Sequence, residues 1–279
     1  ITHTHKKVAA ADKPSVALRG GRDTSMRLAI DLVSGGSAHG VVSAGNTGAL
    51  MAMSKLSLRM CPGIERPAIA SFFPTLKGES CMLDLGANIE CDANNLVQFA
   101  IMGEIFARLV LGLKNPSVGL LNVGSEEQKG HEELREAAMT LRELSGVMKF
   151  IGFIEGDDIT AGTVDVVVTD GFSGNVALKA AEGTAIMFTH FLRSAFQSTI
   201  FTKIGYFLCK SVIRQLRERM DPRRYNGAVF LGLNGIAVKS HGGTDAVGFY
   251  HSIDLCYRII KGNLMGEIKK NLNHLDVKD

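Results

Sequence analysis

The sequence has no tryptophan and few aromatic residues of any kind, which make up 6% of its 279 positions. It shows no signal peptide and no run of about 18 apolar residues, so we expect no membrane-spanning helix. An excess of one charge is also missing, because 31 lysines and arginines stand against 28 aspartates and glutamates. A dedicated nucleic-acid-binding protein usually carries a strong basic excess, so this balance argues against that class.

Cysteine patterns of known chemistry are missing as well. The five cysteines include no C-x-x-C pair, and their odd number does not suit a disulfide framework. We interpret them as reduced thiols of a cytoplasmic protein. No group of His, Cys, Asp and Glu has the spacing of metal ligands, and no nucleotide-binding fingerprint is present. We therefore expect neither a metal nor another cofactor.

Glycine and apolar residues are plentiful and occur in a repeated order. The chain has 31 glycines and is 46% hydrophobic. Four times a short apolar strand ends in Gly, Ser or Asn and leads into an amphipathic helix, and residues 150–159 fit a further strand and loop. This alternation predicts a single three-layer α/β domain over residues 1–279, with a mostly parallel sheet covered by helices on both faces. The four units span residues 39–58, 81–110, 117–144 and 164–188.

Two local signals refine this prediction. Residues 66–86 contain two apolar runs joined by the turn-forming residues 75–79, which predicts a β-hairpin and an antiparallel part of the sheet. Helix starts carry suitable capping residues: Asp23 or Thr24 precedes one predicted helix, and Asn46 or Thr47 precedes another.

Residues 185–224 differ from the rest of the chain. Phenylalanines and aliphatic residues at helical spacing alternate there with lysines and arginines, and Glu218 is the only acid between Ala185 and Met220. This pattern predicts an amphipathic helical hairpin. It fits a dimer interface or core helices, and it equally fits a contact with a membrane surface. The candidates for membrane contact are Phe196, Ile200, Phe201, Ile204 and Phe207.

The candidate chemistry gathers in loops that follow strands. In an open α/β sheet, ligands bind at the carboxyl ends of strands, and a helix N-terminus there suits an anion. The loops at residues 43–48, 84–88, 122–130 and 169–175 have this form and predict a site for an anionic, phosphate-bearing small molecule. The candidate phosphate-binding or substrate-binding residues are Asn46, Thr47, Gly48, Asn88, Asn122, Ser125, Ser173 and Asn175.

Charged side chains could complete such a site. Lys129 can pair with phosphate or stabilise an oxyanion, although a solvated helix start is the plainer alternative. Lys239, Ser240 and His241 precede a Gly-Gly turn at a predicted helix start. We interpret Asp84 as an anchor that holds its own loop through backbone hydrogen bonds.

Taken together, these loops resemble the bacterial phosphate acyltransferase family of the PlsX type. Any one of the matching stretches is a weak signal, but the ordered set between Asp12 and Ala246 is specific. The stretches are DKPSVALRG, SMRLAI, SAGNTGAL, ERPAIA, LDLGAN, LLNVGSEEQKG, FIGFIEGDDI, VDVVVTDGFSGNVALKAAEG, RRYNGAVFLGLNG and VKSHGGTDA.

The resemblance implies a fold related to isopropylmalate dehydrogenase and phosphotransacetylase. It also implies a homodimer that is cytoplasmic, with peripheral association to the inner membrane face. The implied reaction moves a fatty acyl group from acyl carrier protein to inorganic phosphate, and the acyl phosphate then feeds the glycerol-3-phosphate acyltransferase of phospholipid synthesis. Members of the family begin with a strand and an Asp-Ala-Met-Gly-Gly-Asp type loop. We expect this N-terminal strand unit to be missing here and the chain to be less than fully active.

The expected mechanism is direct attack of phosphate on the thioester carbonyl. We expect phosphate to sit in one cleft formed by the loops of Asn46, of residues 122–129 and of residues 173–175. Ser173 lacks the G-x-S-x-G elbow and no Ser-His-Asp set is visible, so an acyl-enzyme is not required. An apolar channel for the acyl chain is expected under the helices of residues 188–207. Lys129, Lys239 and His241 are the candidate catalytic residues, and Arg214, Arg217, Arg223 and Arg224 are the candidates for docking the acidic carrier protein.

Two other functions fit the same sequence. One is an acyl-CoA:phosphate transferase of the phosphotransacetylase kind, which a comparison of acyl donors would distinguish. The other is a membrane-surface scaffold without catalysis, which would bind liposomes without turnover. A decarboxylating dehydrogenase of the related fold is disfavoured, because the sequence has no clustered aspartates for a divalent metal.

Overall fold

The computed structural model describes residues 1–273, apart from the side chains of residues 219, 272 and 273. Residues 274–279, which the predicted domain includes, lie outside the described residues. Eight strands form one sheet in the order β1-β8-β7-β2-β3-β6-β4-β5. The strands are β1 (Gly40–Ser43), β2 (Ala68–Thr75), β3 (Gly78–Leu83), β4 (Ser117–Leu121), β5 (Lys149–Ile154), β6 (Val166–Val168), β7 (Ala228–Leu231) and β8 (Ile236–Lys239).

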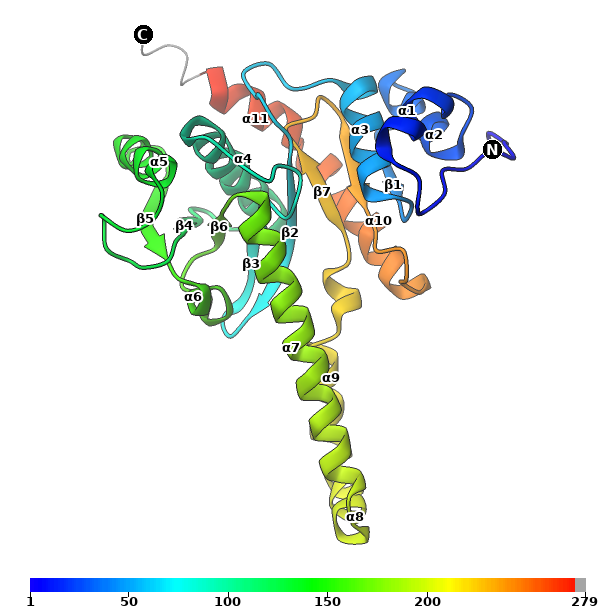
Figure 1. Cartoon of the computed structure of the whole chain (residues 1–279), viewed down its shortest axis with the longest axis vertical. Coiled ribbons are helices and arrows are strands. Elements are labelled where there is room, and N and C mark those ends of the chain that lie inside the picture. The colour runs from blue at the N-terminus through cyan, green and yellow to red at the C-terminus, as the bar shows by residue number, and fades with distance from the viewer. Residues whose placement is uncertain (274–279) are drawn as a thin grey trace.

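Helices lie on both sides of this sheet, and three of them form an arm that projects from the body (Figure 1). The body helices are α1 (Pro14–Gly20), α2 (Ser25–Ser34), α3 (Thr47–Leu58), α4 (Ala93–Leu111), α5 (Glu132–Glu143), α6 (Gly156–Ala161), α10 (Ala246–Lys261) and α11 (Leu264–Asn273). The arm is built from α7 (Gly171–Gln197), α8 (Ile200–Leu208) and α9 (Lys210–Arg219), and a short 3-10 helix η1 (Pro222–Tyr225) leads back to β7.

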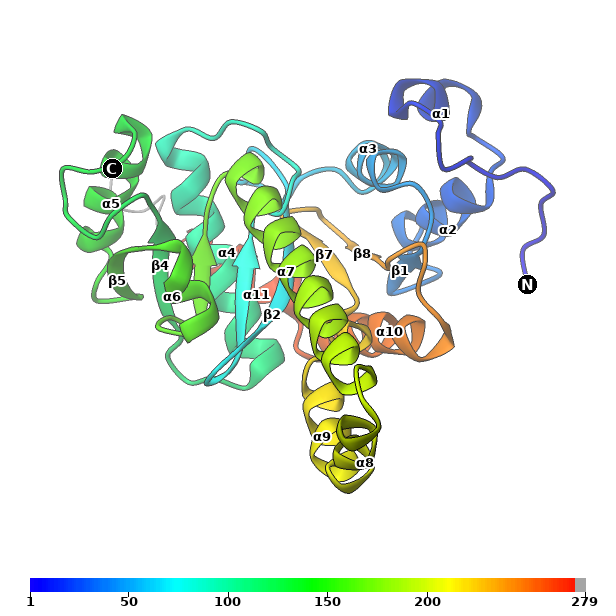
Figure 2. The same cartoon turned by 60° about the horizontal axis from the view of Figure 1, so that its bottom comes forward.

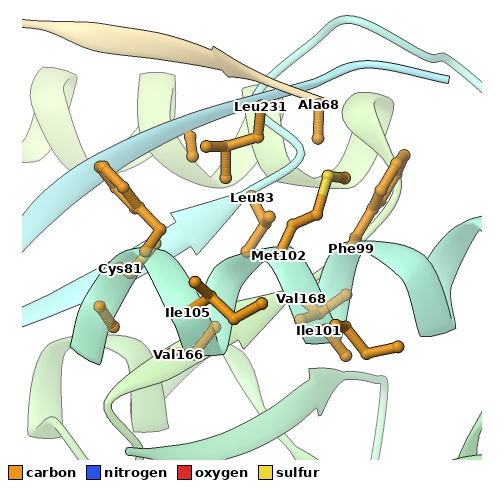
Figure 3. Close-up of a cluster of buried hydrophobic side chains, with 14 of the residues drawn as sticks. Ala68, Cys81, Leu83, Phe99, Ile101, Met102, Ile105, Val166, Val168 and Leu231 are labelled. Atoms are coloured by element: carbon orange, nitrogen blue, oxygen red, sulfur yellow. The ribbon is translucent and has the colours of Figure 1, made fainter. Parts of the chain in front are cut away.

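The strands are mostly apolar because helices cover much of both faces of the sheet. Successive side chains of a strand point to opposite faces of the sheet. In β6, Val166 and Val168 join the core cluster that includes α4, α5, α10 and α11, whereas Val167 joins the cluster that includes α1, α2, α3 and α6. Figure 3 shows the first cluster, in which Met102 of α4 lies beside Leu83 of β3. The predicted fold class, a mixed α/β fold with a mostly parallel sheet, is confirmed.

The predicted hairpin is β2 and β3. They pair antiparallel around a two-residue loop, with Thr75 opposite Gly78, whose positive φ of 136° suits glycine. β7 and β8 are antiparallel as well. Because β2 is also antiparallel to β7 and β1 is parallel to β8, the strands β1 and β8 run against β3, β6, β4 and β5. The carboxyl ends of these two groups of strands therefore lie at opposite edges of the sheet.

Local capping signals explain several helix starts. Thr24 is the N-cap of α2 and Asn46 is the N-cap of α3. Each is one of the two capping residues predicted for its helix. The loop predicted at the end of residues 150–159 is wrong, because α6 forms there. Glu155 and Asp158 make a reciprocal capping box, and Gly162 ends the helix in the left-handed conformation.

The arm begins inside the body of the protein. Asp170 caps α7, whose buried residues are Gly171 and Gly174 in its first turn, so the helix starts well before residue 185. From there α7 leaves the body, and α8 and α9 return along it (Figures 1 and 2). Within residues 1–273, no helix is both long enough and apolar enough to cross a bilayer.

Candidate active site

Asp84 organises the loop that follows β3. Its side chain is fully buried, and its carboxylate accepts hydrogen bonds of 2.7–3.1 Å from the backbone N–H groups of Ile69, Gly86, Ala87 and Asn88 and from the Asn88 amide. Burial raises the pKa of the Asp84 carboxyl, whereas these hydrogen bonds favour its charged form and oppose the rise. The geometry is that of a loop anchor.

The first turn of α7 packs directly on this loop. The backbone N–H of Gly171 donates to the Asn88 carbonyl at 2.7 Å, and the Asn175 amide donates to the Leu85 carbonyl at 3.0 Å. A Cβ on Gly171 would overlap the Asn88 carbonyl, and one on Gly174 would overlap the carbonyl of Asp84. Glycine at both positions therefore allows the close approach that fixes the start of α7.

The loop after β4 is closed by a single amide. Asn122 is buried, its Nδ2 donates to the Lys129 carbonyl at 3.1 Å, and its Oδ1 accepts from the backbone N–H of Val123 at 2.9 Å. Ser125 and Lys129 are exposed on this loop. In the described part of the chain, no carboxylate lies within ion-pair distance of the Lys129 ammonium, so its charge is available to an anion.

These loops meet at one edge of the sheet, which we call the site edge. They follow β3, β6 and β4, which are adjacent and parallel, so their carboxyl ends point the same way. The amides of Asn88, Asn122 and Asn175 are engaged in holding the loops. The polar side chains left to meet a ligand include those of Ser125, Lys129 and Ser173. This set can bind an anion beside the N-terminus of α7.

Asn46 lies at the opposite edge, where β1 ends. Its Nδ2 donates to the carbonyls of Ala10 and Asp12 at 2.9 and 3.0 Å, and its Oδ1 accepts from the Ala49 N–H at 2.9 Å. The amide thus fastens the N-terminal segment to α3, and its donors are not free for phosphate. Thr47 and Gly48 are exposed beside it.

Lys239 and His241 follow β8, also at the opposite edge. Lys239 is half-buried, and burial lowers the pKa of its ammonium, whose Nζ donates to the Ser240 carbonyl. His241 is exposed, and its Nδ1 accepts from the Gly243 backbone N–H at 3.1 Å. That bond occupies Nδ1, and among the described residues the Nε2 of His241 has no hydrogen-bond partner.

Sequence reasoning missed Asn226, which holds this second group of loops together. Its Nδ2 donates to the Ser240 hydroxyl at 2.9 Å and to the Gly248 carbonyl at 2.8 Å, and its Oδ1 accepts from the His241 N–H at 2.9 Å. The only local signal is the Asn-Gly pair, in which Gly227 has a φ of 132°. The partners of Asn226 are 14 to 22 residues away in sequence, so the pair alone could not identify them.

The expected single cleft is therefore wrong within one chain. The loops of Asn122 and Ser173 lie at the site edge, whereas the loop of Asn46 lies at the opposite edge with Lys239 and His241. The reason is three antiparallel steps in a row, β3–β2, β2–β7 and β7–β8, whose odd number leaves the two halves of the sheet running in opposite directions.

Comparisons with known proteins decide the family. A family model described as "Fatty acid synthesis protein" matches residues 1–266. A phosphate acyltransferase of Rhodospirillum centenum is 62% identical over 275 residues, which cover 99% of this chain and 78% of that protein. The chain belongs to the phosphate acyltransferase family. A second member, from Paramagnetospirillum magneticum, is 56% identical over 275 residues with the same coverage. The expected family and enzyme class, a transferase, are confirmed.

Solved structures of much lower sequence identity share the fold of this phosphate acyltransferase family member. A phosphotransacetylase from Streptococcus pyogenes has a TM-score of 0.60 at 17% identity, covering 88% of this chain and 70% of that chain. The EutD phosphotransacetylase from Staphylococcus aureus has a TM-score of 0.54 at 15% identity, covering 86% and 68%. At such identities the likeness shows the fold alone.

The four arginines predicted for carrier-protein docking are not equivalent. Arg223 makes bidentate contacts with Asp221 and an ion pair of 2.9 Å with Asp245, which raises the pKa of the Arg223 guanidinium. Its charge is therefore compensated by two carboxylates. Arg214 and Arg217 are exposed on α9, and Arg224 is exposed on η1. These three present positive charge to solvent.

The residues predicted for membrane contact lie at the tip of the arm of this phosphate acyltransferase family member. Ile200, Phe201, Ile204 and Phe207 are between 56% and 81% exposed. Phe196 is half-buried because its ring packs edge-on against Tyr206, with centroids 5.5 Å apart. The expected acyl channel beneath these helices is wrong, since the apolar side chains of α8 face solvent and none of its residues is buried.

Proposed function

We propose that the chain transfers a fatty acyl group from acyl carrier protein to inorganic phosphate, forming an acyl phosphate for phospholipid synthesis. The observation that carries the proposal is 62% identity over 275 residues to a protein named phosphate acyltransferase. The match to a fatty acid synthesis model supports a fatty acyl group as the one transferred. The site edge supports an anionic acceptor, because Lys129, Ser125 and Ser173 lie beside a helix N-terminus there.

The proposed reaction is direct attack on the thioester. A phosphate oxygen bonds to the carbonyl carbon, the C–S bond breaks, and the leaving thiolate takes up a proton. Lys129 stabilises the developing oxyanion, and Ser125 and Ser173 position the phosphate. Lys239 and His241 remain candidates for protonating the thiolate only where a homodimer brings the two edges of the sheet together.

Two observations support a mechanism without an acyl-enzyme. In the described part of the chain, no serine or cysteine side chain hydrogen-bonds a histidine, as an activated nucleophile would. Burial also raises the pKa of Cys91 to about 12 and that of Cys256 to about 11, so these thiols stay protonated near neutral pH.

The arm supports the remaining parts of the proposal. The exposed apolar side chains of α7 suit contact with a second copy of the chain, and those of α8 suit the inner membrane face. The charges of Arg214 and Arg217 on α9 suit binding of the acidic carrier protein. Peripheral association with the cytoplasmic side of the membrane would bring the acyl phosphate to the glycerol-3-phosphate acyltransferase that consumes it.

The test is release of free thiol from palmitoyl-acyl carrier protein, with and without inorganic phosphate. It is run on this chain and on a version extended with the segments of the Rhodospirillum centenum relative that lie outside the match. We expect phosphate-dependent release that is faster than from palmitoyl-CoA. Lys129→Met should lower kcat by about 100-fold, whereas Lys55→Met, on an exposed lysine of α3, should not. Faster release from the CoA thioester would favour a phosphotransacetylase-like function, and no release from either folded version would favour a scaffold.

A further inference from the structure

Four large apolar side chains are exposed at the site edge, and we call them the edge patch. Ile89, Val123, Phe172 and Val176 are 73%, 80%, 63% and 52% exposed. Loops and helix starts at such an edge are usually polar, and leaving these side chains in water forgoes the stabilisation that burial of each would give. Exposed apolar side chains that gather at one place indicate a surface with a partner.

One backbone hydrogen bond and the geometry of α7 bring three of the four into the same region. The 2.7 Å bond from the Gly171 N–H to the Asn88 carbonyl places Ile89 and Phe172 on residues next to the two bonded ones. Val176 is one helical turn after Phe172 and so lies on the same face of α7. Phe172 and Val176 are therefore neighbours on the outer side of the helix start, beside the loop that carries Ile89.

Val123 comes from the adjacent strand. β4 and β6 pair in parallel, with Leu120 opposite Val168, so the residues after both strands emerge side by side. The Asn122 side chain accepts from the Val123 N–H at 2.9 Å and holds this part of the backbone in place. The edge patch thus spans the loops after three adjacent strands, β3, β6 and β4.

Polar groups are interleaved with the edge patch. Ser173 lies between Phe172 and Val176 in sequence, and Ser125 and Lys129 share the loop of Val123. The edge therefore offers donors and a positive charge next to apolar surface. Acyl phosphates and acyl thioesters have the matching character, with a polar reacting head joined to an apolar chain.

We propose that the edge patch binds the acyl chain of the substrate and sets the chain-length preference of the enzyme. This rests on the proposed function. The head of the substrate lies at Lys129 and the serines, and the chain runs across Phe172 and Val176 on the surface of the body. The occupant is thus the substrate tail, and a second copy of this chain is the alternative that the experiment must separate.

The experiment compares a long and a short acyl donor on matched variants. The double variant Phe172→Ser/Val123→Ser removes apolar surface from two of the loops. Tyr250→Ser/Ile253→Ser removes it from α10, where these residues are 62% and 47% exposed outside the site. We expect the edge variant to lower kcat/KM for palmitoyl-acyl carrier protein about tenfold, and to change that for butyryl-acyl carrier protein less than twofold. The α10 variant should change neither.

Two further measurements keep the outcomes apart. Val176→Ser, one turn into α7, should show the same long-chain loss to a smaller degree. Equal loss with both donors, or no loss, overturns the proposal. Sedimentation of each variant identifies the alternative occupant, because a dimer that dissociates in the edge variant would make the patch an interface between copies and overturn the proposal as well.

Binding of decyl phosphate and of ethyl phosphate, measured by calorimetry, separates this proposal from the proposed function. One outcome is that the unsubstituted protein shows no turnover and still binds decyl phosphate. If the edge variant then binds decyl phosphate about tenfold more weakly, the edge patch holds an alkyl chain although acyl transfer fails. If turnover is intact and the edge variant binds decyl phosphate as well as the unsubstituted protein does, the proposed function stands and this inference fails.

Discussion

Helix α4 and the arm are both rich in apolar residues, yet they have opposite surroundings. Of the 19 residues of α4, 13 are buried, because the helix lies between the sheet and its neighbours α5, α10 and α11. Of the 27 residues of α7, only Gly171 and Gly174 are buried, and α8 has none. The comparison teaches that apolar periodicity predicts a helix with an apolar face. It does not predict whether that face packs against other elements of the same chain.

The sharpest way to test this comparison is to remove one phenylalanine from each region. Phe106 of α4 is fully buried and stacks on Phe72 with centroids 5.0 Å apart, so Phe106→Ala should lower the free energy of unfolding by about 4 kcal/mol. Phe201 of α8 is 81% exposed, and Phe201→Ala should change it by less than about 0.5 kcal/mol. Urea unfolding followed by circular dichroism measures both. Equal losses would mean that the arm is covered in solution.

Glycines of α7 provide a second contrast within one helix. Gly174→Ala drives a methyl group into the Asp84 carbonyl, so it should destabilise the protein by about 3 kcal/mol and lower acyl transfer as the site edge shifts. Gly183 meets nothing within 4 Å, and Gly183→Ala should stabilise the protein by about 0.5–1 kcal/mol, because alanine favours helix. Thermal unfolding gives both values. A neutral Gly174→Ala would show that α7 can move away from its loop.

The smallest expected effect is on the KM for acyl carrier protein, and it distinguishes Arg214 and Arg217 of α9 from Arg223 of η1. Arg214→Glu/Arg217→Glu reverses two exposed charges on α9 and should raise the KM for acyl carrier protein about fivefold, with less effect at high salt. Arg223→Ala should change that KM less than twofold, since Asp221 and Asp245 already compensate its charge. Steady-state kinetics at two salt concentrations decide this. The reverse order of effects would place the carrier protein at η1 instead.

The parts of the fold that were predicted correctly depend on local patterns. The strands follow from continuous apolar runs, the β2–β3 hairpin from the residues around Leu76 and Lys77, and the helix starts from caps such as Thr24 and Asn46. Helix α6 was missed because its capping box, from Glu155 to Asp158, lies in a short acidic segment that also suits a loop.

The site was harder to predict because it depends on which strands are adjacent and on their direction. The sequence indicates that the loops of Asn46, Asn122 and Ser173 follow strands. It does not indicate that three antiparallel steps, β2–β3, β2–β7 and β7–β8, send the loop of Asn46 to the opposite edge. The exposed state of Ile89 and Phe172 likewise could not be inferred, because Ile and Phe are more often buried than exposed in folded proteins.

The continuity of α7 has a mechanical consequence. Its 27 residues form one helix about 40 Å long, without a proline or a loop between the site edge and Gln197, where α7 ends. Such a rod transmits tilt rather than absorbing it, and its fixed end is the turn of Gly171 and Gly174 that packs on the Asp84 loop. A force applied to the far end of the arm would therefore act with leverage on the backbone that holds Ser173.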